Sequence, residues 1–313
     1  MSTPDPVMNG YNRWLVGVMV VCFACIAAGA ETAAVPARGL WFWAKPSSPQ
    51  GAVNVVGDAS REAEALATFE RWHVRRIYGS YSALPVEVPA RVAAWNRRLH
   101  AQGIHSASLF SDGGALTPTG RAAFLLQVEA RLLAFNAAQA DAAARFDSIA
   151  LDIEPHAQPR WKSATPTEKR ALLEDLLTTC TALRSHLDTH GGHALPVAAA
   201  LAYWLDRLPA EGGSIGWTSA ADRDDWFVRL GRSVAQISLM AYERPAPAAI
   251  LDATAWERVH FSGRVITALR ARLGVEWRGL ADLQRVLPAV EADSPPGIDL
   301  ENYELLRLAE AVK

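Results

Sequence analysis

Two acidic residues close an apolar segment near the middle of the chain, and they are well suited to acid–base chemistry. Segment 146–155 is mostly apolar, as in a strand buried on both faces, and its final residue, Pro155, should end that strand. Because strand side chains alternate, Asp152 and Glu154 should point to the same side, about 6–7 Å apart. Two neighbouring carboxyls in a partly buried site cannot both ionise cheaply, so the pKa of one should rise. Glu154, at the end of the strand, is therefore the candidate general acid.

The same segment resembles the strand-four motif of the family-18 glycoside hydrolases, which are chitinases and endo-N-acetylglucosaminidases. That motif, Asp-Gly-hydrophobic-Asp-hydrophobic-Asp-x-Glu, is matched here by Asp147, Ile149, Leu151, Asp152 and Glu154. Ser148 replaces the family's Gly, and Ala150 replaces its middle Asp, which helps to modulate the catalytic acid. A second segment, Met240-Ala241-Tyr242-Glu243, is similar to the family's Met-x-Tyr-Asp on strand six.

The resemblance implies a mechanism in which the substrate supplies its own nucleophile. Glu154 would protonate the glycosidic oxygen, Asp152 would orient the substrate's acetamido group, and Tyr242 would hydrogen-bond the resulting oxazolinium. No metal or organic cofactor is implied. An ordinary retaining pair of Glu154 with Glu301 or Glu243 stays open as the alternative, because the two schemes differ in carboxylate arrangement.

Strand and helix patterns alternate from residue 39 to the C-terminus. Eight such repeats favour a single closed (β/α)8 TIM-like barrel over residues 36–313 rather than an open sheet. No glycine-rich dinucleotide fingerprint follows the first strand. The expected strands are 39–44, 75–81, 105–110, 146–154, 195–204, 236–242, 264–269 and 297–303, and the main expected helices are 61–73, 89–102, 121–143, 166–190, 220–232, 254–260, 280–291 and 304–312.

Aromatic and acidic residues recur at the expected C-terminal ends of these strands, where active sites of such barrels lie. Sugar rings stack on aromatic faces and hydrogen-bond to carboxylates, so the pattern indicates a carbohydrate ligand. About half of these aromatic residues should instead be structural, since aromatic residues are common in strands. The candidate substrate-binding residues are Trp41, Trp43, Tyr78, Asp112, Tyr203, Trp204, Glu301 and Tyr303.

Three histidines, His186, His190 and His193, lie near the end of the helix 166–190. Their i, i+4 spacing could hold a metal. Polar side chains at a helix C-terminus more simply interact with its exposed carbonyls, and this end of the helix faces away from Glu154. The sequence therefore predicts no metal.

The N-terminus resembles a processing segment. Residues 14–28 are apolar, Arg13 precedes them, and Ala28-Gly29-Ala30 fits a cleavage site before Glu31. We expect residues 1–30 to be a signal peptide and the protein to be exported to the periplasm or the exterior. An uncleaved membrane anchor is the alternative, although the segment is short for a transmembrane helix.

The bulk composition fits this view. The chain has 313 residues, 50% of them hydrophobic and 20% charged, with a net charge of −2. This balance gives no reason to expect nucleic acid or an anionic membrane as a partner. The sequence predicts a monomeric glycoside hydrolase-like protein that acts on a polysaccharide or oligosaccharide, and the family resemblance points to an N-acetylated one. The alternatives are a non-catalytic carbohydrate-binding barrel and a membrane-anchored envelope protein.

Overall fold

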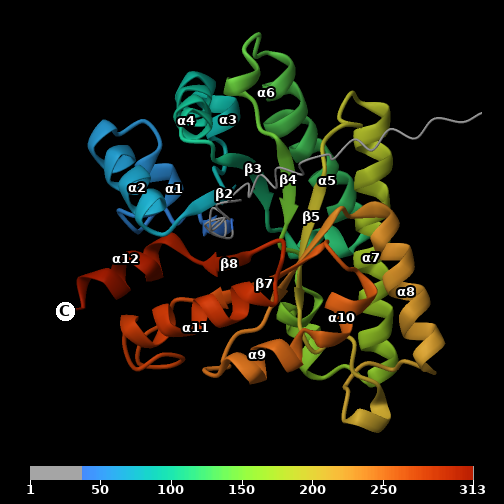
Figure 1. The fold of residues 1–313 in the computed structure, drawn as a ribbon. Helices are drawn as coiled ribbons and strands as arrows, with labels where there is room; N and C mark the ends of the chain where they lie inside the picture. Colours follow the sequence, from blue (N-terminus) through green and yellow to red (C-terminus); the bar gives the residue numbers. More distant parts are fainter. Residues whose placement is uncertain (1–36, 313) are drawn as a thin grey trace, which may run out of the picture. The chain divides into compact units, whose positions relative to one another are not determined.

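Eight parallel strands close into a barrel in the computed structural model, which describes residues 37–312 (Figure 1). Each strand pairs with the next, and the last pairs with the first through Gly39↔Asp299 and Leu40↔Leu300. The predicted (β/α)8 barrel is confirmed. The strands are β1 Arg38–Phe42, β2 Val74–Gly79, β3 His105–Phe110, β4 Ser148–Leu151, β5 Val197–Ala202, β6 Gln236–Met240, β7 Val265–Arg270 and β8 Ile298–Glu301.

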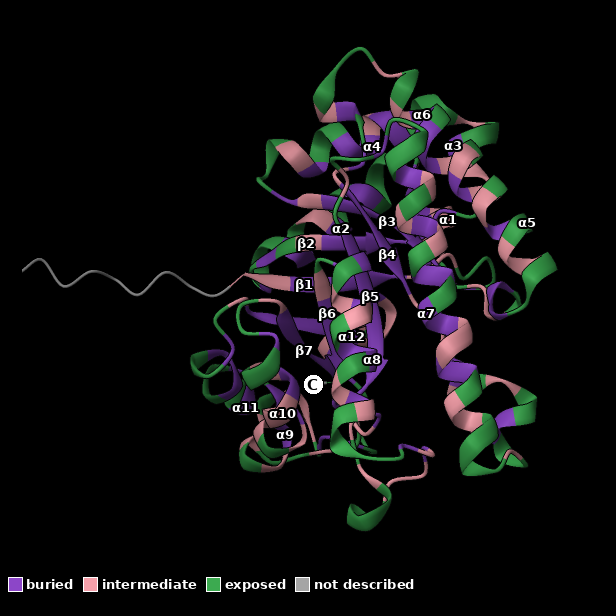
Figure 2. Cartoon of the chain, turned by 90° about the vertical axis from the view of Figure 1, so that its right-hand side faces the viewer, coloured by how far each residue is buried: buried purple, intermediate pink, exposed green. Residues whose placement is uncertain are grey.

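Helices connect the strands and cover the outside of the barrel. Their exposed faces alternate with buried ones, while the strands are mostly buried (Figure 2). The α-helices are α1 Ala52–Val55, α2 Ala59–Arg71, α3 Leu84–Glu87, α4 Pro89–Ala101, α5 Pro118–Val128, α6 Ala134–Ala137, α7 Pro166–Thr189, α8 Ala220–Ser233, α9 Pro247–Ala253, α10 Ala255–His260, α11 Leu280–Ala292 and α12 Tyr303–Ala311. Short turns are η1 Gly113–Leu116, η3 Ala142–Ala144, η4 Pro155–Ala157, η5 Pro159–Lys162 and η6 Pro209–Glu211, and η2 Glu129–Leu133 is a π-helical turn.

The sequence located the elements well but placed several boundaries wrongly. The long helix expected over 121–143 is divided into α5, η2 and α6, and α9 was not anticipated. The predicted start of α7 is correct: Thr165 and Glu168 form a capping box, in which the Thr165 N–H donates to the Glu168 carboxylate at 2.7 Å. Most predicted strands were too long, because polar residues beyond Leu151 and Met240 continue the chain without continuing the sheet.

The interior of the barrel contains an ionic network near its N-terminal end. Asp299 is fully buried and accepts hydrogen bonds from Ser238 Oγ at 2.6 Å, Tyr78 Oη at 3.2 Å and Arg76 Nη2 at 3.3 Å. A Cβ on Gly39 would lie 2.0 Å from Asp299 Oδ1. Gly39 therefore lets β1 and β8 close around a buried carboxylate that three donors satisfy.

Aromatic packing on the outer face ties the helices to β1. Phe42 points away from the interior and contacts Phe69 of α2, Trp95 of α4 and Tyr303 of α12, with ring centroids 5.3–6.2 Å apart. Aromatic pairs in such geometries contribute about 0.5–1.5 kcal/mol each beyond their buried area. These aromatic contacts hold α2, α4 and α12 against the outer face of β1.

Among residues 37–312, no helix combines the length and apolar character needed to cross a bilayer. The predicted signal segment, residues 1–30, lies outside the described part of the chain.

Candidate functional site

Three carboxylates meet at the C-terminal mouth of the barrel. Asp152 and Glu154 follow β4, and Glu301 is the last residue of β8. The Asp152 N–H still donates to the Phe110 carbonyl at 2.9 Å, so the backbone keeps its sheet-like course for one residue past the strand. All three side chains are partly buried. The predicted parity of Asp152 and Glu154 therefore places them on the inner side of the barrel, near a third acid from the opposite end of the sequence.

The carboxylates perturb one another. Burial raises the pKa of Asp152 well above its ordinary range, and the charges of Glu154 and Glu301 and a hydrogen bond with Glu154 raise it further. Burial also raises the pKa of Glu301, and Arg270 partly offsets this rise. The Asp152 carboxyl consequently retains its proton at a pH at which isolated carboxyls have lost theirs. A site that holds a proton in this way can deliver it to a leaving group.

The Tyr242 side chain faces the same group. It follows β6, and its pKa is raised well above the ordinary value by burial and then by the charges of Glu301, Asp152 and Glu154. The phenol thus stays protonated and can donate a hydrogen bond into the mouth. Tyr242 therefore lies close enough to Glu301, Asp152 and Glu154 for their charges to act on its hydroxyl.

Arg270, at the end of β7, is the positive charge beside these acids. Its Nε lies 2.7 Å from Glu276 Oε1 and 4.0 Å from Glu301 Oε2, and its guanidinium lies 5.0 Å from the centre of the Tyr242 ring. Glu243, the last residue of the second motif, reaches Arg270 at 3.5 Å, but its side chain is 77% exposed. Glu243 therefore extends toward solvent rather than into the carboxylate cluster.

Sequence reasoning missed Arg270 and Glu276. A signal for Arg270 was available, because an arginine directly after the apolar run 265–269 must lie at the mouth once the barrel is assumed. No comparable signal marks Glu276, which lies in the loop after β7. A cavity of about 550 Å³ lies next to Glu276 and is lined by Pro245, Gly274, Val275, Glu276, Trp277, Arg278, Asp282 and Arg285.

An aromatic group flanks Glu154 on the β4 and β5 loops. His156 Nε2 lies 3.6 Å from Glu154 Oε2, and the His156 ring packs at 5.4 Å against Trp204, which lies 5.9 Å from Trp161. Burial lowers the pKa of His156, with a smaller opposing effect from Glu154. A neutral imidazole beside Glu154 gives the acid a polar neighbour that leaves its proton available.

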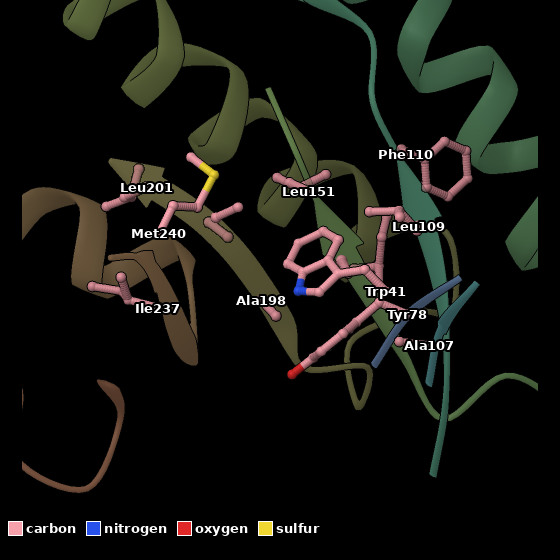
Figure 3. Packing of buried hydrophobic residues seen from close by; sticks show 14 of the residues in the cluster. Trp41, Tyr78, Ala107, Leu109, Phe110, Leu151, Ala198, Leu201, Ile237 and Met240 are labelled. Carbon is pink, nitrogen blue, oxygen red and sulfur yellow. The ribbon is translucent and has the colours of Figure 1, made fainter. Parts of the chain in front are cut away.

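Trp41 belongs to β1 and Trp43 follows the strand, with ring centroids 5.9 Å apart. Trp41 is only 3% exposed, and Figure 3 shows it beside Tyr78, whose ring centroid is 5.0 Å away. The Trp41 indole nitrogen and Glu301 Oε2 are both buried, and neither has a hydrogen-bond partner within residues 37–312. Trp41 therefore belongs to the barrel interior, and Trp43 is the more accessible of the two rings.

Two of the predicted binding residues lie elsewhere. Tyr78 points into the lower half of the barrel, where its hydroxyl contacts Asp299 and accepts from Gln236 Nε2 at 2.7 Å. Tyr303 lies outside the barrel, 2% exposed, against Phe42 and Phe69. Both errors have one cause: a tyrosine near the end of a strand can satisfy its hydroxyl within the protein, and the sequence does not show which partner is present.

The other two loop residues have local partners. Asp112 caps η1 by accepting a hydrogen bond from the Gly114 N–H at 2.8 Å. The Tyr203 ring packs under Arg244, with 4.1 Å from the guanidinium to the ring centre, and Arg244 also donates to its hydroxyl. Of the predicted residues, the structure groups Asp152, Glu154, Tyr242 and Glu301 at the mouth, and Trp204 joins them through His156.

Solved structures resemble this barrel in fold. No family model matches the chain, and no curated protein matches it. A GH18 chitinase from Pseudoalteromonas aurantia superposes with a TM-score of 0.52 at 11% identity, covering 88% of this chain and 99% of the chitinase.

Two further structures give similar values. A chitinase from Bacteroides thetaiotaomicron has a TM-score of 0.51 at 12% identity, covering 88% of this chain and 95% of its own. The PgaB (BpsB) glycoside hydrolase domain from Bordetella bronchiseptica has a TM-score of 0.51 at 11% identity, covering 89% and 98%. At these identities the likeness shows the fold, which is the TIM barrel of these glycoside hydrolases.

The raised pKa of Asp152 makes a prediction about stability. The folded state binds this proton more tightly than the unfolded state, where the pKa is near its ordinary value of 3.8. The stabilisation is therefore complete below that value and is lost as the pH rises through the folded pKa. Asp152→Asn removes the ionisation, so the Tm of the variant relative to the wild type should increase from pH 4 to pH 8. A flat difference for Asp152→Asn would contradict the raised pKa.

Proposed function

We propose that the protein is a glycoside hydrolase that cleaves an N-acetylated polysaccharide, with Glu154 as the general acid. The observation that carries this proposal is the group of Asp152, Glu154 and Tyr242 at the mouth of the barrel, where burial and the neighbouring carboxylates raise the pKa of Asp152 and burial raises that of Tyr242. The TIM-barrel glycoside hydrolases that share the fold support the same reaction class.

The pair explains how a proton reaches the glycosidic oxygen. In the free site the proton lies on Asp152, in its hydrogen bond with Glu154. A hydrogen bond from the substrate's acetamido N–H favours the ionised form of Asp152, so when Asp152 accepts from the substrate, its proton passes to Glu154. Glu154 then protonates the glycosidic oxygen as the bond from that oxygen to C1 breaks.

The acetamido oxygen forms the new bond to C1 and gives an oxazolinium ion. The Asp152 carboxylate stabilises its positive charge, and the Tyr242 hydroxyl donates to the acetamido oxygen. Glu154, now ionised, removes a proton from water as the water oxygen attacks C1 and the bond from C1 to the acetamido oxygen breaks. This step restores the acetamido group, regenerates the acid and retains the configuration. Arg270 limits the repulsion between Glu301 and the developing carboxylates.

A carbohydrate-binding protein without turnover is the second candidate, and Ala150 favours it. This residue is 1% exposed and occupies the inner position one strand repeat below Asp152. Ala150 has no carboxylate that could share a proton with Asp152 from below. The raised pKa of Asp152 therefore depends on its burial and on Glu154 and Glu301. The third candidate, an anchored envelope protein, depends on the N-terminal segment.

Glu154→Gln tests the proposal. The amide keeps the volume and loses the proton, so hydrolysis should fall by about 10²–10⁴-fold while the Tm changes little. Release of reducing ends from soluble N-acetylated oligosaccharides is the measurement. Glu243→Gln is the matched control, because Glu243 lies at the same mouth but its side chain is largely exposed. Activity of Glu154→Gln near the wild-type level would remove Glu154 as the acid, and ligand binding by an inactive wild type would favour the second candidate.

Substrate assistance makes a separate prediction. Chemical removal of the N-acetyl groups should abolish cleavage, because the nucleophile is lost while the hydroxyls remain. Tyr242→Phe should lower kcat by about 10²-fold, the usual loss for one transition-state donor. Equal cleavage of acetylated and de-acetylated substrates, together with inactivation by Glu301→Gln, would instead establish the ordinary pair of Glu154 and Glu301.

We also propose that the protein is exported and that residues 1–30 are removed. The apolar run 14–28 before Ala28-Gly29-Ala30 motivates this proposal. Mass spectrometry of protein from the expressing cell's envelope or medium should find a mature N-terminus at Glu31. An intact N-terminus in the membrane fraction would establish the anchored form.

A further inference from the structure

We infer that Glu129, His186 and His190 form a binding site for a transition-metal ion of the Zn²⁺ class, separate from the carboxylate site. The three side chains each offer a ligand atom, and these atoms all lie within 4.8 Å of one another. Imidazole nitrogens with one carboxylate oxygen are a ligand set suited to Zn²⁺, Cu²⁺ or Ni²⁺ and unsuited to Mg²⁺ or Ca²⁺.

Two helices build the site. His186 and His190 are four residues apart, on the last turn of α7 and at its cap, so they lie on the same face. Glu129 belongs to the π-helical turn η2, which follows α5 directly. Helices α5 and α7 are neighbours (Figure 1), and Arg121 of α5 donates to Thr179 of α7 at 3.1 Å. A bound metal would cross-link these two helices.

The distances are close to those of a coordinated ion. Zinc bonds of about 2.0–2.2 Å in a tetrahedral site separate the ligand atoms by roughly 3.3–3.5 Å. His186 Nε2 and Glu129 Oε2 are already 3.2 Å apart. The His186 and His190 rings are stacked with centroids 4.0 Å apart and planes inclined by 21°. A small rotation of the exposed His190 ring would turn its nitrogen lone pair toward the other two atoms.

The neighbours of His190 hold it in the tautomer that a metal needs. Its Nδ1 lies 2.9 Å from the His186 backbone carbonyl. A carbonyl can only accept, so Nδ1 carries the hydrogen, and the lone pair is left on Nε2. A ligating histidine typically donates its second nitrogen to a carbonyl or carboxylate in this way.

The sequence pointed to a different trio. His193 is exposed and is not part of the group, while Glu129 comes from a helix that lies 57 residues before His186. The site is at the end of α7 that leads into β5, so it lies toward the N-terminal ends of the strands, away from Glu154. Its occupancy should therefore affect stability without a direct effect on hydrolysis.

The test uses protein purified without a polyhistidine tag and stripped with EDTA. Isothermal titration with ZnCl₂ should show one Zn²⁺ per chain, and zinc at 100 times the Kd should raise the Tm by about 3–6 °C. MgCl₂ should do neither. His190→Ala and Glu129→Gln should each weaken zinc binding by at least about tenfold.

His193→Ala is the matched control and should bind zinc as the wild type does. Because His190 is exposed, its variant should fold as the wild type does, and its Tm without zinc checks this. Absence of zinc binding by the wild type would overturn the inference. Wild-type affinity in His190→Ala, or equal weakening in His193→Ala, would show that zinc binds elsewhere and would overturn it as well.

Discussion

The charge balance around Arg270 is the interaction on which the mouth of the barrel depends. Asp152, Glu154 and Glu301 are brought together by strands far apart in the sequence, and their mutual repulsion opposes this arrangement. The Arg270 guanidinium lies beside Glu301 and over the Tyr242 ring, and Glu276 holds it in place. Arg270 thus allows an acidic cluster to exist in a partly buried position. The repulsion that Arg270 does not offset contributes to the raised pKa of Asp152.

The barrel separates two kinds of buried acid by layer. In the lower layer, Asp299 has donors from Arg76, Tyr78 and Ser238, so its hydrogen-bonding capacity is used internally. In the upper layer, Asp152 has another acid as its partner, so ionisation of the Asp152 carboxyl is unfavourable. The first arrangement stabilises the fold and the second reduces stability at neutral pH, which is typical of a site maintained for chemistry rather than for folding.

The departures from the family-18 motif have a structural meaning in this barrel. Ala150 continues the small inner face of β4, and Ser148 is bound by His105 Nε2 at 2.8 Å near the N-terminal end. Asp147 is bound to the Ser106 N–H and to His100, so it anchors β3 and α4 rather than facing the mouth. The first half of the motif therefore serves packing, and Asp152 and Glu154 hold its chemical capacity.

The sequence determined the elements whose signals are local. Eight apolar runs fixed the strand count, alternation fixed the shared side of Asp152 and Glu154, and Thr165 with Glu168 fixed the start of α7. The tertiary structure decided which distant residues meet. Arg270 beside Glu301, Glu129 beside His186, and Tyr303 on the outer face of β1 all depend on how helices and strands pack. A side chain's partner is set by the closure of the barrel and the docking of its helices, and neither leaves a periodic signal in the chain.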